Sequence, residues 1–213
     1  KPKKFWHKIA DENFTWYQKW DKVVEFDMQK AEFTWFKNAK VNITKNCIDR
    51  HLANKGDKNA IIFEPNNPNE APRYYTYSQL YAEVSRLANV LRDQGIKKGD
   101  RVCIYLPMIP ELAFSVLACA RIGAIHSVVF GGFSANALST RINDSTCKML
   151  ITADGGFRGA KTIDLKNIAD EALKNTPSIE KVLVVKRTNQ EVNMVEDRDL
   201  WLEPLLEKAE TTS

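Results

Sequence analysis

From residue 59 to the middle of the 180s, short apolar runs alternate with segments that carry apolar residues at helical spacing. The runs predict strands over 60–63, 102–106, 126–130, 149–152 and 182–185. Because these runs lack a polar residue at every second position, both faces of the sheet need a cover. The alternation therefore predicts an α/β fold: a largely parallel, doubly wound sheet with helices on both faces.

Capping residues mark where the intervening helices start and end. Thr76 and Gln79 form a capping box, in which a hydroxyl and an amide satisfy free N–H groups of the first turn. Pro110 begins an apolar helix that Gly123 closes, and the all-round apolar character predicts that this helix is buried. The other helices are predicted after Ser134, after Asp164 and over 201–206.

The first 58 residues lack this alternation and are rich in aromatic rings. Ten of the 21 aromatic residues precede Lys37. We interpret 1–58 as an arm that lies across a larger body and buries its rings there, and 59–213 as the α/β part. Stacking on single-stranded nucleic acid is the alternative, but acidic residues are interleaved with the rings.

Composition excludes several classes of function. The net charge is +4, from 31 basic and 27 acidic residues without a basic cluster, which argues against nucleic acid as a partner. The four cysteines form no CxxC pair, so we expect reduced thiols and no metal site. We find no signal peptide and no apolar run long enough for a bilayer, and predict a cytoplasmic protein without a membrane partner. The ends suggest an excised piece: the chain starts without Met and stops in a linker-like run, 210–213.

Two glycine-containing loops follow predicted strands, where ligands bind in such sheets. Phe130, Gly131 and Gly132 lead into a helix, and the glycines either let a ligand approach the backbone or serve a tight turn. The second loop places Arg158 and Lys161 in a glycine-rich, flexible segment, either as a phosphate site or as a solvated surface. We expect the two loops at neighbouring strand ends, where an aromatic ring and two cations would suit adenine and a ribose phosphate. His126, at the start of a strand, is interpreted as a packed core histidine.

The run LACARIGAIHSVVFGGFS (117–134) resembles the acetyl-CoA synthetases of the adenylate-forming superfamily. The resemblance covers nearly the whole chain and includes NCIDRHL (46–52), GIKKGD (95–100) and DLW (199–201). It implies an enzyme that joins acetate to ATP, releases pyrophosphate, and passes the acetyl group from acetyl-AMP to coenzyme A. Acetate, ATP and coenzyme A are then the small-molecule partners, and Mg²⁺ is expected in the full-length enzyme.

The resemblance also implies a role for both loops. Phe130, Gly131 and Gly132 would lie beside the adenine of coenzyme A, and the segment Arg158, Gly159, Ala160 and Lys161 would bind its 3′-phosphate. The family often has an acidic residue and a second Arg where this chain has Gly155 and Lys161. Because Lys lacks the planar fork of Arg, we expect weaker or differently salt-sensitive phosphate binding.

The family's phosphate loop, acetate pocket and catalytic lysine are not found in this chain. We therefore expect an inactive N-terminal piece with part of the coenzyme A site, no tightly bound cofactor, no catalytic residue of its own, and the remainder of its own chain as a partner. The alternatives are a propionate–CoA ligase, or a non-catalytic module that binds coenzyme A or is purely structural.

Overall fold

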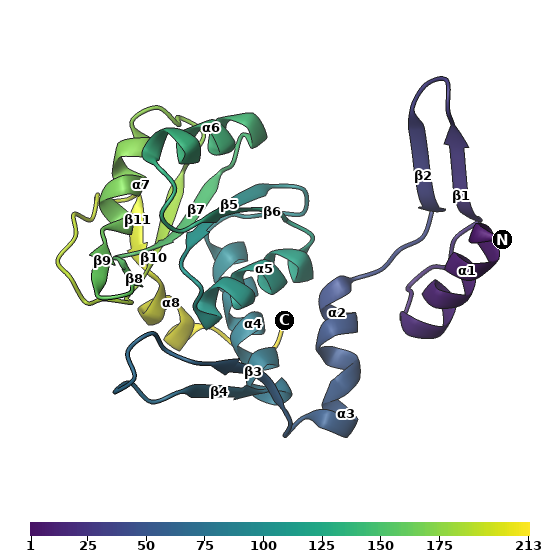
Figure 1. Ribbon diagram of the computed structural model, residues 1–213, viewed down its shortest axis with the longest axis horizontal. Coiled ribbons are helices and arrows are strands. Elements are labelled where there is room, and N and C mark those ends of the chain that lie inside the picture. The colour runs from purple at the N-terminus through teal and green to yellow at the C-terminus, as the bar shows by residue number, and fades with distance from the viewer.

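A five-stranded, fully parallel sheet forms the centre of the computed structural model, which describes residues 1–213 (Figure 1). In spatial order its strands are β11 (Asp199–Trp201), β10 (Lys181–Val185), β7 (Met149–Ala153), β5 (Arg101–Leu106) and β6 (Ile125–Phe130). Helices α4 (Tyr77–Asp93), α5 (Pro110–Ile122) and α8 (Leu202–Lys208) cover one face. Helices α6 (Ala135–Ser145) and α7 (Leu165–Leu173) cover the other, which confirms the doubly wound α/β prediction.

The predicted helix signals operate as expected, with one exception. The Thr76 hydroxyl accepts from the N–H of Gln79, and the Gln79 side chain accepts from the N–H of Thr76. Gly123 ends α5 in the left-handed region at φ 75°, where a side chain would be strained. Asp164 occupies the N-cap position of α7, but its side chain makes no capping hydrogen bond.

Two strand predictions need correction. The strand predicted over 60–63 is β3 (Asn59–Phe63), and it pairs antiparallel with β4 (Arg73–Thr76), outside the main sheet. Trp201 belongs to the edge strand β11 and not to the last helix. Both errors have one cause: a short apolar run does not reveal which partner completes its backbone hydrogen bonds.

β6 forms the second edge of the sheet and is only half covered. Ile125, Val128 and Phe130 are 48–59% exposed, and His126 is exposed as well. The interpretation of His126 as a packed core histidine is therefore wrong. At the centre of the sheet, by contrast, every residue of β7 is buried.

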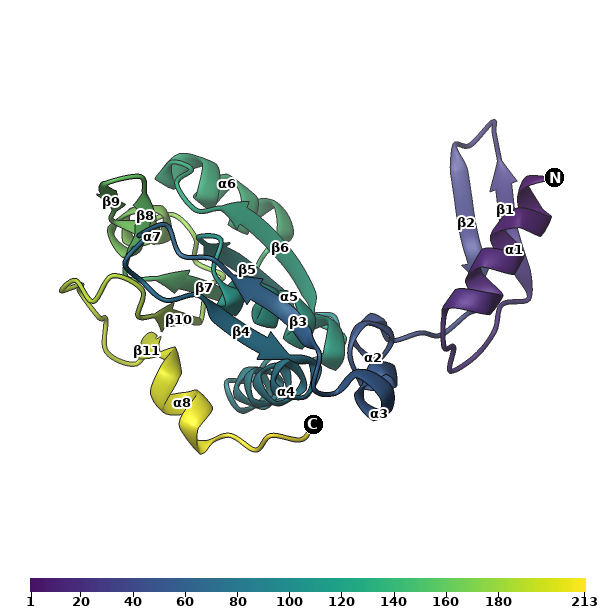
Figure 2. The same cartoon turned by 60° about the horizontal axis from the view of Figure 1, so that its bottom comes forward.

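The first 37 residues form a small N-terminal module of α1 (Pro2–Asn13) and a hairpin of β1 (Lys22–Asp27) and β2 (Glu32–Lys37). Figure 2 shows this module standing away from the sheet. Its rings pack on one another: the Trp20 ring centroid lies 5.1 Å from that of Trp16 and 5.0 Å from that of Phe36. The prediction that the arm buries its rings on the body is wrong, because these rings find partners within the module.

The arm meets the body through residues 42–52, the docking segment, which contains α2 (Ile43–Cys47) and a 3₁₀ turn, Asp49–His51. The Thr44 hydroxyl donates to the Leu117 carbonyl of α5 (2.8 Å), and Asp49 forms a bidentate ion pair with Arg121 (3.1 Å). Ile48 is the first residue to join the continuous hydrophobic core. Helix α3 (Leu52–Lys55) then leads into β3. Polar pairing, the buried Ile48 and the partly buried Leu52 thus dock the arm.

Candidate coenzyme-binding edge

Three strands end side by side at the candidate site. β5 lies between β6 and β7, so the two glycine-containing loops follow strands that are one strand apart and not neighbours as predicted. Pro107, which follows β5, fills the space between them. A Cβ on Gly131 would lie 3.0 Å from the Pro107 nitrogen, and one on Gly156 would lie 3.4 Å from the Pro107 Cβ. Glycine is needed at Gly131, where a Cβ would also lie 2.8 Å from the Leu106 carbonyl oxygen, whereas at Gly156 the contact with Pro107 is ordinary van der Waals packing.

The side chain of Tyr105, in β5, holds the loop that follows β6 in place. Its buried hydroxyl donates to the Phe133 carbonyl (2.8 Å) and accepts the N–H of Gly132 (3.2 Å). Burial raises the pKa of this hydroxyl, against the effect of the Gly132 hydrogen bond, so it remains a donor at neutral pH. Gly132 itself has φ 123° and must be glycine. The tight-turn reading of these glycines is therefore confirmed, while a ligand beside them stays a prediction.

Phe130 presents its ring to solvent at the mouth of this loop. The ring is 59% exposed and packs edge-on against Phe133, with 5.8 Å between centroids. The Arg141 guanidinium lies 5.4 Å from the Phe133 ring centroid and supports that ring from α6. An exposed flat ring held in place by a second ring offers a stacking surface to a planar ligand.

The second loop is a β-hairpin and not the flexible segment that the sequence suggested. β8 (Gly156–Arg158) pairs antiparallel with β9 (Lys161–Ile163), and Gly159 turns the chain at φ 60°. Arg158 and Lys161 lie directly opposite each other in this pairing. Side chains that face each other across a hairpin share one face, so both cations point the same way. All four residues from Arg158 to Lys161 are exposed.

Ile163 connects the hairpin to the first loop. It pairs with Gly156 and therefore shares the face of Arg158 and Lys161. A Cβ on Gly132 would lie 3.7 Å from the Ile163 Cδ1, which is ordinary van der Waals contact. The face that carries the two cations thus turns towards the loop that follows β6. The structure brings the two predicted groups of residues to one edge although β5 separates their strands.

Asp154 anchors the start of the hairpin, a role that the sequence did not reveal. Its buried carboxylate accepts backbone N–H bonds from Gly155 (2.6 Å), Arg187 (2.8 Å) and Thr188 (3.0 Å). These bonds tie the end of β7 to the chain that follows β10. An acidic residue directly after a buried strand was the available signal, but two of its three partners lie over 30 residues away.

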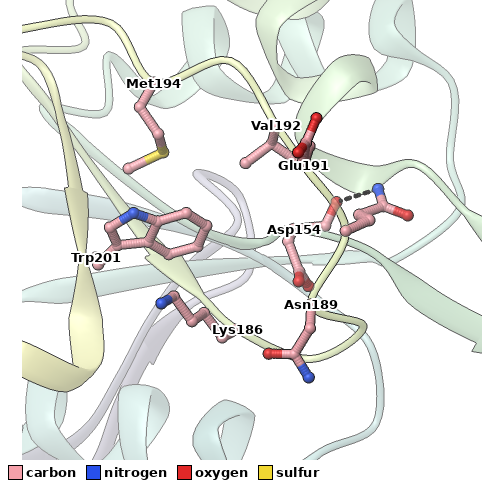
Figure 3. Close-up of a pocket in the computed structure, with 8 residues that line it drawn as sticks. Asp154, Lys186, Asn189, Glu191, Val192, Met194 and Trp201 are labelled. Atoms are coloured by element: carbon pink, nitrogen blue, oxygen red, sulfur yellow. Dashed lines mark hydrogen bonds between the residues drawn. The ribbon is translucent and has the colours of Figure 1, made fainter.

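A pocket of about 470 Å³ lies further along the same edge, beside β11 (Figure 3). Figure 3 shows Trp201 and Met194 on one side and Asp154, Asn189 and Glu191 on the other. The Lys186 ammonium already lies 4.9 Å from the Trp201 ring centroid, and the Asp154 carboxylate is satisfied by backbone N–H groups. None of Phe130, Gly131, Gly132 and residues 158–161 lines this pocket.

Comparisons with known proteins agree on the relatives of this chain. A family model described as AMP-binding enzyme matches residues 48–211, and one described as acetyl-coenzyme A synthetase N-terminus matches residues 1–47. An acetyl-coenzyme A synthetase of Rubrobacter xylanophilus is 55% identical over 207 residues, which are 97% of this chain and 32% of the relative. One of Magnetococcus marinus is 50% identical over 200 residues, 94% of this chain and 31% of the relative.

A solved structure supports the fold independently. The acetoacetyl-CoA synthetase from Streptomyces lividans superposes with a TM-score of 0.87 at 24% sequence identity. The superposition covers 98% of this chain and 31% of that protein. The chain thus spans about 31% of the length of the relatives it matches. No helix of the chain has the length and apolar character to cross a bilayer.

Proposed function

The chain belongs to the AMP-binding enzyme family, and we propose that the complete protein is an acetate–CoA ligase. In the proposed reaction, acetate attacks the α-phosphorus of ATP, giving acetyl-AMP and pyrophosphate. The thiol of coenzyme A then attacks the acetyl carbon, loses its proton, and displaces AMP. About 50% identity to acetyl-coenzyme A synthetases over 94% or more of the chain supports this reaction.

Within that reaction, we propose that this chain binds the nucleotide end of coenzyme A. Phe130 would stack on the adenine, and Gly131 and Gly132 would let it approach the backbone. Arg158 and Lys161, with Gly159 and Ala160 between them, would hold the 3′-phosphate. The observation that carries this proposal is the pairing of Arg158 with Lys161 on the hairpin face that turns towards Gly132. Two cations on one face suit a dianionic phosphate.

The chain contributes no assigned magnesium ligand. It contains no group of three or more His, Cys, Asp or Glu side chains arranged to hold a metal ion. In the complete enzyme, Mg²⁺ would screen the phosphate charge of ATP. We further propose a division of the chain at residues 58 and 59, a cytoplasmic location, no nucleic-acid partner, and the remainder of the polypeptide as the structural partner.

Calorimetric titration of the complete protein tests the coenzyme A site. We expect Arg158→Ala to weaken coenzyme A about tenfold, because a charge-assisted hydrogen bond contributes roughly 1.5–3 kcal/mol before solvent screening reduces it. The affinity for 3′-dephospho-coenzyme A should hardly change. Lys174→Ala removes an exposed cation from the end of α7 and is the matched control. An equal loss for both ligands would contradict the phosphate role of Arg158.

Pyrophosphate release tests the reaction. The complete protein should release pyrophosphate from Mg-ATP when acetate is added, and more slowly with propionate if acetate is the preferred acid. The 213-residue chain alone should release none. Clear turnover by this chain, or a complete protein that ignores acetate, would refute the assignment.

A further inference from the structure

The hairpin β8–β9 has a second face, opposite to the proposed phosphate-binding cations. Phe157 lies between Gly156 and Arg158 in β8, so its side chain points to the other side. There the Arg187 guanidinium lies 5.0 Å from the Phe157 ring centroid and 5.6 Å from that of Phe63. Arg187, from the loop after β10, thus packs against the hairpin face opposite to Arg158 and Lys161.

Glu70 fixes that cation in turn. Its carboxylate oxygens accept from both terminal nitrogens of Arg187, at 3.1 and 3.3 Å. The Arg187 side chain is 13% exposed and the Glu70 side chain 33%, so this bidentate pair is partly shielded from solvent. The backbone N–H of Arg187 is held by Asp154, at the root of the hairpin. Arg187 therefore connects the hairpin to the loop between β3 and β4.

Asn66 reaches the hairpin from the same loop. Its Nδ2 donates to the carbonyl of Gly159 in the turn, at 2.8 Å. This is the one hydrogen bond that a side chain gives to residues 157–162. A Cβ on Gly159 would have no neighbour within 4 Å, and residues of both the turn and the loop line a cavity of about 480 Å³. Little besides Asn66 holds the tip of the hairpin.

We propose that Asn66 is a positioning residue for coenzyme A, and that the Glu70–Arg187 pair supports it from behind the hairpin. Asn66 fixes the turn so that Arg158 and Lys161 meet the 3′-phosphate together. An isolated two-stranded hairpin is marginally stable in water, so an unanchored one would have to be ordered when the ligand binds. That ordering would weaken binding. This inference rests on the proposed function, because the loop has a role only if the hairpin binds a phosphate.

Steady-state kinetics of the complete protein with coenzyme A and 3′-dephospho-coenzyme A test this role. We expect Asn66→Ala to raise KM for coenzyme A about fivefold, the effect of one lost hydrogen bond. KM for the dephospho form and kcat should stay within about twofold. Asn69→Ala is the matched control, because Asn69 lies in the same loop and its side chain makes no hydrogen bond to the hairpin. A purely structural defect would move both KM values together.

A second variant tests the same role if Asn66→Ala folds poorly. Glu70→Gln removes the charge that holds Arg187, and we expect it to lower the preference for coenzyme A over the dephospho form by threefold or more. Acetate-dependent exchange between ATP and pyrophosphate, measured without coenzyme A, should be unchanged in all three variants.

The same exchange assay separates the two proposals. If the wild-type protein lacks acetate-dependent exchange, the proposed function is refuted and the role of Asn66 falls with it. If the exchange is present but Asn66→Ala and Glu70→Gln keep the wild-type preference for coenzyme A, the positioning role alone is overturned.

Discussion

The N-terminal module and the parallel sheet are both rich in apolar side chains, but they bury them to different degrees. In β7 and β10, at the centre of the sheet, nearly every residue is buried. In the module, Phe5, Tyr17 and Phe33 are 57–64% exposed, and Ala10 is the one buried residue. A parallel sheet is covered by helices on both faces, whereas a two-stranded hairpin with one helix cannot enclose its rings.

This difference in burial indicates which region contributes most of the stability of the molecule. The hydrophobic effect is proportional to the apolar area removed from water, so the sheet and its helices supply most of it. The module contributes ring-to-ring contacts that remain partly wet. Changes of the same chemical kind should therefore have large effects in the body and small effects in the module.

The largest effect is expected at Lys166, whose side chain is fully buried in α7. Its ammonium pairs with Asp170 (2.7 Å) and with the buried Asp199 (2.9 Å). Lys166→Met would leave these carboxylates with Arg198 as their one cationic partner, and we expect a loss of about 3–5 kcal/mol in the free energy of unfolding. Urea denaturation measures it. Lys174→Met changes an exposed lysine just beyond the end of the same helix and should cost less than about 0.5 kcal/mol.

Leu150 tests the packing of the sheet itself. It is fully buried in β7 between β5 and β10, and Leu150→Ala should destabilise the protein by about 3 kcal/mol through lost contacts and a cavity. Leu150→Met conserves the volume and should cost less than about 1.5 kcal/mol. If both variants unfold at the same urea concentration, packing at this position does not determine stability.

Asp49 tests the junction between the two regions. Asp49→Asn replaces the charged partner of Arg121, whose side chain is only 8% exposed, and should cost about 2 kcal/mol. We expect faster hydrogen exchange in the docking segment, with the sheet unaffected. Asp57→Asn, at an exposed residue without an ion pair, is the control. Uniformly faster exchange across the sheet would mean that the arm is not a separate unit.

Phe33 should give the smallest mutational effect. It stacks on Phe26 across the hairpin, with 6.1 Å between ring centroids, but it is 58% exposed. Phe33→Ala should therefore change the free energy of unfolding by less than about 1 kcal/mol. A loss of unfolding free energy as large as that of Leu150→Ala would show that the module's rings are buried in solution. It would contradict the difference in burial between the module and the sheet.

Acid titration compares a buried carboxylate with a half-exposed one. Burial raises the pKa of Asp199, but hydrogen bonds from Arg198 and Lys166 outweigh it and hold that pKa below its ordinary value. Its stabilisation is complete above the unfolded pKa and is lost as pH falls through the folded pKa. In the module, hydrogen bonds from Lys22 and Lys37 lower the pKa of Glu25 to about 2.

Salt should separate these two carboxylates. Because the Glu25 side chain is 40% exposed and that of Asp199 is fully buried, the pKa of Glu25 should rise towards the ordinary value in 0.5 M NaCl, while that of Asp199 stays low. NMR titration of the two carboxyl carbons below pH 5 measures this. Equal salt responses would show that Asp199 is open to solvent.

Local signals predicted most of the elements of the body. The capping box at Thr76, the proline at the start of α5 and the left-handed Gly123 act within one helical turn, and all three were read correctly. β4 and β11 were missed because they are only four and three residues long. The buried role of Lys166 was missed because its partner Asp199 lies 33 positions away in the sequence.

The candidate site was likewise predicted only in part. The sequence by itself determined the parallel α/β fold, the two loops at strand ends and the residues in them, because these depend on apolar spacing and glycine. Only the tertiary structure decided that β5 separates the two loops, that Tyr105 fixes Gly132, and that Asn66 and Arg187 hold the hairpin behind its cations. These contacts join residues 27 to 117 positions apart. The chain brings such residues together only when strand order and helix packing are complete, and neither depends on neighbouring residues alone.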